Sequence, residues 1–340
     1  GMLTDSGGFQ VFSHEEFVKL SNAGVRFRAL DYDGSWVEWS PEKNMEIAQK
    51  LGADIVMQLD QCVGYPAPRS KVERSVELSS MWADRCFAAH TRPDQALFGI
   101  VQGGMHLDLR VRSLRHLEDA GDFPGYGIGG YSVGEDHDTM FDSLEPLCAE
   151  YMPKGKPRYL MGVGNPTTLV RGVACGVDMF DCVLPTRTAR TGSAFSSEGR
   201  LNLRHARFTH DHAPLDAACG CPTCTGGYTR AYLHHLVRQK EMAGSMLISQ
   251  HNVWYLLDLM RRARKAVLAE ESAAAKAAAW EKLEVGTIVH GIVRRLTDFG
   301  AFVDIGGVDG LIHITDLSWG RVKHPSDVVK PGDEVDVLVL

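Results

Sequence analysis

Three cysteines lie within six positions of the sequence, and their spacing predicts a metal site. The run is Cys219-Gly220-Cys221-Pro222-Thr223-Cys224. Structural Zn²⁺ takes four thiolate or imidazole ligands in tetrahedral geometry, so a downstream histidine could complete the set. Of His234, His235 and His251 we favour His251, which we expect at the start of a helix, from where it could fold back. The alternative, three reduced thiols in a loop, would leave solvent-facing cysteines open to oxidation. With four protein ligands, the single zinc would be structural.

Two aspartates stand where a carboxylate could take part in catalysis. Asp5, in Asp5-Ser6-Gly7-Gly8-Phe9-Gln10, follows the apolar pair Met2-Leu3, so we expect it where a strand ends in a turn. Asp181 lies in the otherwise apolar run Met179–Leu184, where a carboxylate without a partner would be costly. An ordinary turn aspartate and a salt-bridged aspartate are the respective alternatives.

A basic segment could bind phosphate groups locally. Arg187–His210 contains five arginines, two histidines and one acidic residue. Such a local excess of positive charge can hold a nucleic-acid backbone. The alternative is a solvated hairpin at the rim of the fold.

The overall composition limits the class of protein. The chain has 340 residues, 44% of them hydrophobic, and 36 Lys+Arg against 43 Asp+Glu give a net charge of −7. This balance excludes a globally basic nucleic-acid coat, so any RNA contact must be local. The sequence has neither an apolar run long enough for a membrane helix nor a signal-peptide pattern in residues 1–10, which predicts a cytoplasmic protein without a membrane partner. Five scattered cysteines suit a reducing compartment: Cys62, Cys86, Cys148, Cys175 and Cys182.

The elements that position these residues alternate between strand-like and helix-like segments, which predicts an α/β fold. The strand-like runs are Ala53–Asp60, Ala96–Gln102, Gly125–Gly130, Arg158–Val163 and Met179–Val183. The helix-like segments between them are Ser70–His90, Leu107–Ala120, Asp138–Glu150 and Pro166–Ala174. Two hairpins are also expected, at Gly24–Leu30 with Ser35–Trp39 and at Ser193–Phe195 with Arg200–Leu203.

The placement of polar residues favours a (β/α)8 barrel over a doubly wound sheet. Asp60, Gln102, Gly130 and Asp181 lie at or near the C-terminal ends of different runs. Barrels gather their chemistry from the ends of several strands. An open sheet would concentrate it at one switch point.

The C-terminal part has a different pattern. Arg261–Ala279 is charged and then alanine-rich, which is typical of a helical linker. The β-like, turn-rich runs that follow predict a small antiparallel barrel: Val285–Leu296, Phe299–Ile305, Asp309–Ile314 and Glu334–Leu340.

The first part of the chain resembles the tRNA-guanine transglycosylases over about residues 2 to 260. The motifs match in order and spacing at Thr4–Gln10, Asp60 with Cys62, Gly99–Gly104, Gly127–Glu135, Tyr159–Gly164, Phe180–Arg187 and Cys219–Leu236. The resemblance implies a zinc-bearing (β/α)8 barrel that exchanges the wobble guanine of GUN-anticodon tRNAs for a deazaguanine base, pre-queuine or queuine. It also implies a homodimer.

The resemblance assigns roles to single residues. Asp181 would be the nucleophile that attacks the ribose anomeric carbon, and Asp5 the general acid/base. Asp60, Gln102 and Gly130 would hydrogen-bond the base, with Phe9 and Met161 on its two faces. Arg187 and Arg190 would contact tRNA. The family's zinc ligands fall on Cys219, Cys221, Cys224 and His251.

About residues 283 to 340 resemble the S-one RNA-binding repeat, which is an OB-fold. The likeness rests on Phe299-Gly300-Ala301-Phe302-Val303 and Gly310-Leu311-Ile312-His313-Ile314. It implies that Phe299, Phe302 and His313 stack on single-stranded RNA. Against this, residues 280 to 340 hold six Lys+Arg and ten Asp+Glu, and the phenylalanines could instead be core. The predicted domains are 1–265, a barrel with a zinc subdomain; 266–281, a helical linker; and 282–340, a partial OB-fold.

The chain also departs from both families. It opens directly on the strand that carries Asp5, so we expect a barrel that lacks its first strand and helix, and an OB-fold that lacks its closing strand. Gln61 and Tyr131-Ser132 replace the usual Glu and Leu-Ala, which leaves the base inserted open. An inactive RNA-binding scaffold is the main alternative function, and a zinc-dependent hydrolase is a weaker one because no open metal position is predicted.

Overall fold

The structure is a computed structural model of the 340-residue chain. It describes all residues except 9–16, 30–32, 282–286, 299, 306–308, 319–321, 323 and 340, and of 272–281, 309 and 315 it describes the backbone alone. The described residues divide into two compact units, Gly1–Met260 and Arg261–Leu340. Among the described helices, none combines the length and apolar character that crossing a membrane requires.

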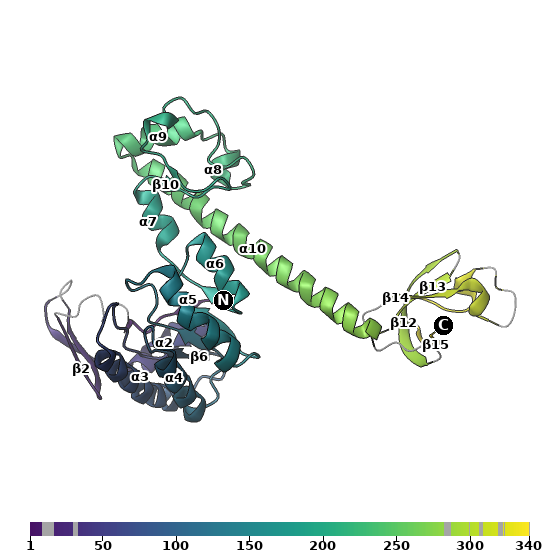
Figure 1. The fold of residues 1–340 in the computed structure, drawn as a ribbon, viewed down its shortest axis with the longest axis horizontal. Coiled ribbons are helices and arrows are strands. Elements are labelled where there is room, and N and C mark those ends of the chain that lie inside the picture. The colour runs from purple at the N-terminus through teal and green to yellow at the C-terminus, as the bar shows by residue number, and fades with distance from the viewer. Residues whose placement is uncertain are drawn as a thin grey trace. The chain divides into compact units, whose positions relative to one another are not determined.

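A six-stranded parallel sheet forms the centre of the first unit (Figure 1). Each strand pairs with the parallel strand that follows it along the chain: β1 (Leu3–Thr4), β5 (Ile55–Met57), β6 (Ala96–Val101), β7 (Tyr126–Ile128), β8 (Arg158–Leu160) and β9 (Met179–Phe180). A doubly wound sheet reverses its strand order at a switch point, and this sheet does not. The α/β prediction is confirmed, and the order is that of a singly wound sheet.

Helices connect these strands, and local sequence determines where they begin and end. They are α2 (Pro41–Leu51), α3 (Arg69–Ala89), α4 (Leu107–Ala120), α5 (His137–Pro146), which continues as the π-helical turn η2 (Leu147–Tyr151), α6 (Pro166–Ala174) and α7 (Leu184–Arg190). The Ser40 side chain caps α2 by accepting from the Lys43 N–H, and Gly52 ends this helix with a φ of 73°. Asn165 caps α6 ahead of Pro166.

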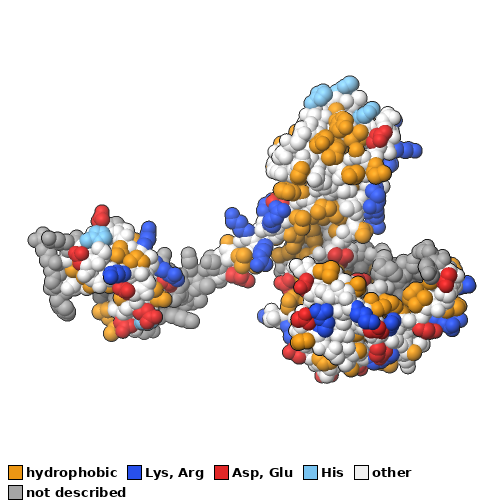
Figure 2. All heavy atoms as spheres, turned by 180° about the vertical axis from the view of Figure 1, so that it is seen from behind, with side chains coloured by type: hydrophobic (Ala, Val, Ile, Leu, Met, Phe, Trp, Pro, Cys, Tyr) orange, Lys and Arg blue, Asp and Glu red, His pale blue; other side chains and the backbone are white. Residues whose placement is uncertain are grey.

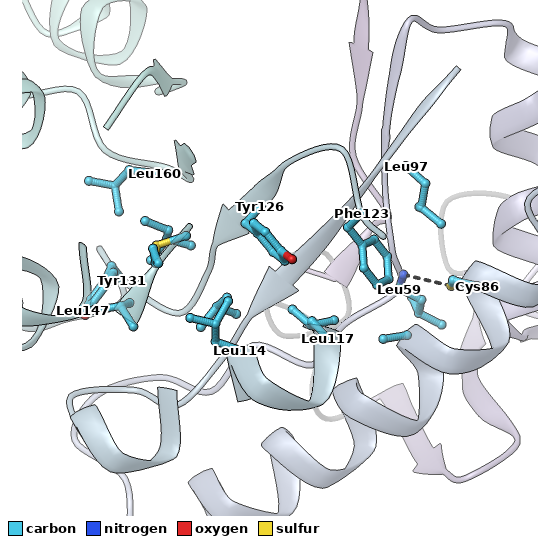
Figure 3. Packing of buried hydrophobic residues seen from close by; sticks show 14 of the residues in the cluster. Leu59, Cys86, Leu97, Leu114, Leu117, Phe123, Tyr126, Tyr131, Leu147 and Leu160 are labelled. Carbon is cyan, nitrogen blue, oxygen red and sulfur yellow. Dashed lines mark hydrogen bonds between the residues drawn. The ribbon is translucent and has the colours of Figure 1, made fainter. Parts of the chain in front are cut away.

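Both faces of the sheet are buried, as is usual for parallel sheets. One face packs against the helices in a cluster that includes Leu97, Leu117 and Phe123 (Figure 3). There the Leu59 N–H donates to the Cys86 thiol at 3.4 Å. The hydrophobic side chains of α3 and α4 therefore hold the outer helices on the sheet.

The opposite face of the sheet shows that the sheet is curled. It forms a second cluster around Met57, Phe98, Ile100 and Tyr159. Leu3 of β1 and Met179 of β9 both pack against this cluster, although their strands lie at opposite ends of the sheet. A barrel that lacks one unit would have seven parallel strands, whereas the described residues form six. The expected seventh parallel strand is therefore not found among the described residues.

Two antiparallel sheets complete the first unit, and both predicted hairpins are confirmed. β3 (Gly24–Arg28) pairs with β4 (Trp36–Trp39), and β10 (Ser193–Ala194) with β11 (Leu201–Asn202). Strand β2 (Val18–Ser21), which pairs with β3, was not predicted from the sequence. This strand is short and lies at a sheet edge, so its sequence alternates too briefly to be distinctive.

A separate lobe of the first unit carries the cysteines. It contains η3 (Ala206–Phe208), α8 (Pro222–Thr225), α9 (Arg230–Gln239) and the first turns of α10 (Met242–Glu281), around a core that includes Phe208, Leu233 and Ile248. The expectation that His251 begins a helix is wrong. Helix α10 starts at Met242, because the segment from Met242 onward packs Leu247 and Ile248 against the lobe's core.

The second unit contains a four-stranded antiparallel sheet in the order β14-β13-β12-β15. Its elements are β12 (Ile288–Thr297), β13 (Gly300–Asp304), β14 (Asp309–His313), η4 (Ile314–Asp316), η5 (Pro325–Asp327) and β15 (Glu334–Leu338). Val293, Ala301 and Val303 form its core. The predicted antiparallel strands are therefore present, and α10, which begins in the first unit, supplies the predicted helical segment.

Candidate functional site

The polar residues that follow successive strands of the parallel sheet converge on one cavity of about 280 Å³. Seven of the predicted site residues line it: Asp5, Asp60, Gln102, Gly130, Met161, Asp181 and Arg187. They follow β1, β5, β6, β7, β8 and β9, and Arg187 comes from α7. These side chains therefore lie together beyond the C-terminal ends of the strands, which is where barrel enzymes place their active sites.

Asp181 is held by two hydrogen-bond donors from β8 and the turn after it. The Tyr159 hydroxyl donates to Asp181 Oδ1 at 2.8 Å, and the Gly162 N–H donates to the same oxygen at 2.7 Å. Oδ2 has no hydrogen-bond partner among the described residues. The salt-bridge interpretation of Asp181 is not supported, since both contacts come from neutral donors. The two hydrogen bonds thus fix Oδ1 of Asp181, and the Asp181 side chain lines the cavity.

Asp5 lies near Asp181 and has a different environment. Its side chain is accessible from the cavity, yet protein atoms surround it on most sides. Burial raises the pKa of Asp5 above its ordinary value, and the charge of Asp181 adds to the rise, although the backbone N–H groups of Ser6 and Gly7 oppose it. A carboxyl group with a raised pKa keeps its proton to a higher pH than an ordinary aspartate does, which suits a general acid.

Asp60 is buried and hydrogen-bonded through both oxygens. The Gln102 amide donates to Oδ2 at 2.6 Å, and the Ser6 hydroxyl donates to Oδ1 at 3.1 Å. Burial, together with the neighbouring Asp5, raises the pKa of Asp60 to about 7. Near neutral pH this group can therefore either donate or accept a hydrogen bond to a ligand in the cavity.

Gly130 allows the backbone to approach Gln102 closely. Its φ is +71°, and a Cβ at this position would lie 2.5 Å from Gln102 Oε1. Any side chain would displace the amide that holds Asp60. Glycine is therefore required here by both conformation and space.

Two residues of the site were not assigned roles from the sequence. Tyr159 could have been found, because it lies two residues before Met161 in the strand-like run Arg158–Val163, where alternate residues share a face. Arg110 of α4 gave no local signal. It is fully buried, its guanidinium stacks on Tyr131 at 3.6 Å, and it donates to the Gly129 carbonyl at 3.0 Å. It therefore supports the turn that carries Gly130 from behind.

The remaining predicted residues of the first unit lie apart from the cavity or outside the described part. Arg190 is exposed at the end of α7 and does not line the cavity. Phe9 lies outside the described residues. By contrast Tyr131, which was given no role from the sequence, lines the cavity, and its hydroxyl pairs with Ser143 Oγ at 2.7 Å.

The structure brings together the four predicted metal ligands. The ligand atoms of Cys219, Cys221, Cys224 and His251 all lie within 4.8 Å of one another. His251 Nδ1 is 3.7, 3.4 and 3.3 Å from the three sulfur atoms, in chain order. His251 Nε2 donates to the Phe195 carbonyl at 2.7 Å, which leaves Nδ1 with a lone pair directed at the thiols.

The protonation chemistry of this cluster also fits a bound cation. Burial lowers the pKa of His251, which favours the neutral imidazole that metals bind. Burial raises the pKa of Cys224 to about 12. Three crowded thiols would lose their protons to solvent only when a cation binds the thiolates, so the donor set suits a metal ion with four protein ligands.

Two of the predicted RNA-contacting residues in the second unit share one face of its sheet. Phe302 pairs with Leu311, and His313 lies two residues further along β14. His313 is exposed, and Phe302 is half-buried with the Arg295 guanidinium 4.2 Å above its ring. Phe302 lies outside the core cluster, so its role as a core residue is not supported. Phe299 lies outside the described residues.

Comparison with known proteins agrees with the geometry of both units. Residues 1–284 match the family described as queuine tRNA-ribosyltransferase, and residues 282–340 match the S1 RNA binding domain. A queuine tRNA-ribosyltransferase of Halothermothrix orenii is 52% identical over 266 residues, which cover 78% of this chain and 70% of that protein. The Bacillus subtilis protein of the same name is 52% identical over 267 residues, with 78% and 69% covered. The chain thus belongs to the queuine tRNA-ribosyltransferase family of tRNA-guanine transglycosylases and carries an S1 RNA binding domain.

Proposed function

We propose that this enzyme replaces the wobble guanine of tRNAs with GUN anticodons by a deazaguanine base, in the queuosine modification of tRNA. The observation that carries the proposal is the difference between the carboxyl groups of one cavity. Asp181 is held by neutral donors, whereas burial raises the pKa values of Asp5 and Asp60. The raised pKa values of Asp5 and Asp60 suit acid/base work, while the hydrogen bonds that orient the Asp181 carboxylate suit a nucleophile. A tRNA-modifying activity also favours a cytoplasmic location.

The nucleophile in this proposal is Asp181. Its carboxylate attacks the anomeric carbon of the ribose as the bond from that carbon to guanine breaks, which gives a covalent aspartyl-ribose link. Asp5 donates a proton to the departing base and later removes one from the incoming base. The incoming base then attacks the same carbon and releases Asp181.

The base would bind beneath these two residues. Asp60, Gln102 and the backbone of Gly130 supply hydrogen bonds to its edge, while Met161 and Phe9 cover its faces. The mixed hydrogen-bonding capacity of Asp60, whose pKa lies at about 7, suits a base edge that presents both donors and acceptors. Arg187 lines the cavity and would bind a phosphate beside the flipped nucleotide. Arg190 would bind the backbone further along.

We further propose that the curled sheet belongs to a (β/α)8 barrel and that the cysteine cluster binds one zinc ion. Zinc would be held by Cys219, Cys221, Cys224 and His251 and would stabilise the lobe. The lobe is linked to the reaction site through Asn252, which donates to the Pro185 carbonyl at 2.9 Å and accepts from the Phe195 N–H at 3.0 Å.

A homodimer is also proposed. Figure 2 shows hydrophobic side chains gathered on the lobe that carries α8 and α9. Exposed residues there include Tyr228 and Tyr232, whose rings stack at 6.0 Å, and the neighbouring Met242 and Met246. An exposed group of this kind is typical of a protein interface. Light scattering of the full chain, compared with a Y228A/Y232A variant, tests whether the dimer forms through this lobe.

Incorporation of radiolabelled guanine into a GUN-anticodon tRNA tests the proposed reaction. We expect exchange by the unmodified chain, and a protein–RNA adduct on denaturing gels. D181N should abolish both, because an amide is a poor nucleophile. D5N should stop exchange, although a slow adduct can remain. An adduct that persists in D181N contradicts the assignment. Absence of exchange and adduct in the unmodified chain would favour an inactive RNA-binding scaffold.

A further inference from the structure

We propose that the outer face of the sheet β2–β3–β4 is a second RNA-contact surface, which binds the phosphate backbone of the tRNA outside the reaction cavity. The inference rests on the proposed function only in that tRNA is the substrate. The surface consists of Lys19, Arg26, Arg28, Trp36 and Glu38.

A single tryptophan gathers three cations on this face. Lys19 Nζ lies 5.2 Å from the centre of the Trp36 ring, Arg26 Cζ lies 5.0 Å from it, and Arg28 Cζ lies 5.9 Å from it. All three are within the range of cation–π attraction. The strand register explains the grouping, since Lys19 pairs with Arg26 and Arg28 pairs with Trp36. The Trp36 ring thus keeps three cations close together, although their charges repel one another.

The opposite face of the sheet fixes this surface to the first unit. The buried Val25 belongs to the main hydrophobic core, and three partly buried side chains pack against that core: Val18, Phe27 and Trp39. The turn between β2 and β3 is held as well, because Trp82 Nε1 donates to the Asn22 carbonyl at 3.3 Å. The cations are therefore presented on a backbone that binding does not need to order.

The charge of the face favours an anionic partner. Among the residues that the structure describes on it, the only acid is Glu38, which pairs with Arg26 at 2.9 Å. Three cations and one acid leave an excess of two positive charges, in a chain whose net charge is −7. Trp36 is 38% exposed and is the only exposed tryptophan among those whose side chains are described. A polyanion would relieve the repulsion between the cations and release its counterions.

Binding of an unmodified GUN-anticodon tRNA transcript to the full chain tests this surface. The variant K19E/R28E should weaken binding about tenfold near 0.1 M salt and lower the slope of log Kd against log salt by about two, one for each lost phosphate contact. We expect a higher KM for tRNA with an unchanged kcat, because these residues do not line the cavity. W36A should weaken binding less than the double variant does, and W36F should restore it since a phenyl ring still attracts cations.

The matched control is K50E/R112E, which changes the net charge equally at exposed cations on α2 and α4. It should leave the Kd and the salt slope unchanged. An equal loss in both double variants would mean that only overall charge matters and would overturn the proposal. Unchanged tRNA binding in K19E/R28E, with or without a change in oligomeric state by light scattering, would also overturn it, and a changed state would identify a protein interface instead. The binding measurement needs no turnover, so a chain that binds tRNA but exchanges no guanine would defeat the proposed function alone.

Discussion

Tyr159 and Asp181 meet across the neighbouring strands β8 and β9, where the phenol hydroxyl donates to Asp181 Oδ1 at 2.8 Å. Burial and the adjacent carboxylate both raise the pKa of Tyr159, so the phenol stays protonated and remains a donor. The contact holds the carboxylate in one orientation and stabilises its charge. Strand β8 therefore carries the positioning group of the proposed nucleophile, which directly follows β9.

The variant Y159F should slow exchange without preventing tRNA binding. It removes one of two donors to Asp181 and leaves the ring that packs on Phe98 and Ile100. We expect kcat to fall about tenfold, since a hydrogen bond to a charged group contributes roughly 1.5–3 kcal/mol. Single-turnover adduct formation measures the effect. An unchanged rate would show that the Gly162 N–H alone positions the carboxylate.

The titration of Asp60 predicts how stability depends on pH. Its pKa is about 7 in the folded protein and 3.8 in the ordinary reference state, so between these values the folded state binds more protons than the unfolded state. The contribution of Asp60 to the free energy of unfolding is therefore fully present below about pH 4, and it is lost as the pH rises through 7. Urea unfolding should therefore show a steeper loss of stability from pH 5 to pH 8 in the unmodified chain than in D60N, which cannot titrate. Parallel curves would mean that Asp60 titrates near its ordinary value.

Removal of one cluster cysteine should release the metal. C221S replaces a fully buried ligand, so we expect less than one zinc per chain by elemental analysis and a lower melting temperature. The matched control is C148S, since Cys148 is equally buried but lies outside the cluster. It should keep the zinc while losing some packing energy. Equal metal content in both variants would contradict the predicted site.

The second unit should bind single-stranded RNA through the face shared by Phe302 and His313. F302A/H313A should weaken binding of a uridine oligomer by the full chain at least about thirtyfold, because each base stacked on an aromatic ring contributes about 1–3 kcal/mol. V328A, which truncates an exposed hydrophobic residue outside the strands, serves as the control. A comparable loss in the control, or none in the double variant, would argue against a stacking platform.

The sequence by itself predicted the α/β fold class, most of the elements in their order and seven of the residues that line the cavity. The spacing of apolar residues in strands and helices is a local property of the sequence. The bounds of helices such as α4 and α6 were therefore predicted to within a residue. The spacing of Cys219, Cys221 and Cys224 likewise predicted the metal ligands, because three of the four lie in one short loop.

Only the tertiary structure decided how these residues act on one another. The curl of the sheet, the bond from Tyr159 to Asp181 and the burial that raises the pKa of Asp60 all join strands that are far apart in the sequence. The grouping of Lys19, Arg26 and Arg28 around Trp36 depends on strand register, and β2 was not predicted at all. Proton affinity and ion pairing depend on distance and desolvation, which a linear pattern does not contain until the chain has packed.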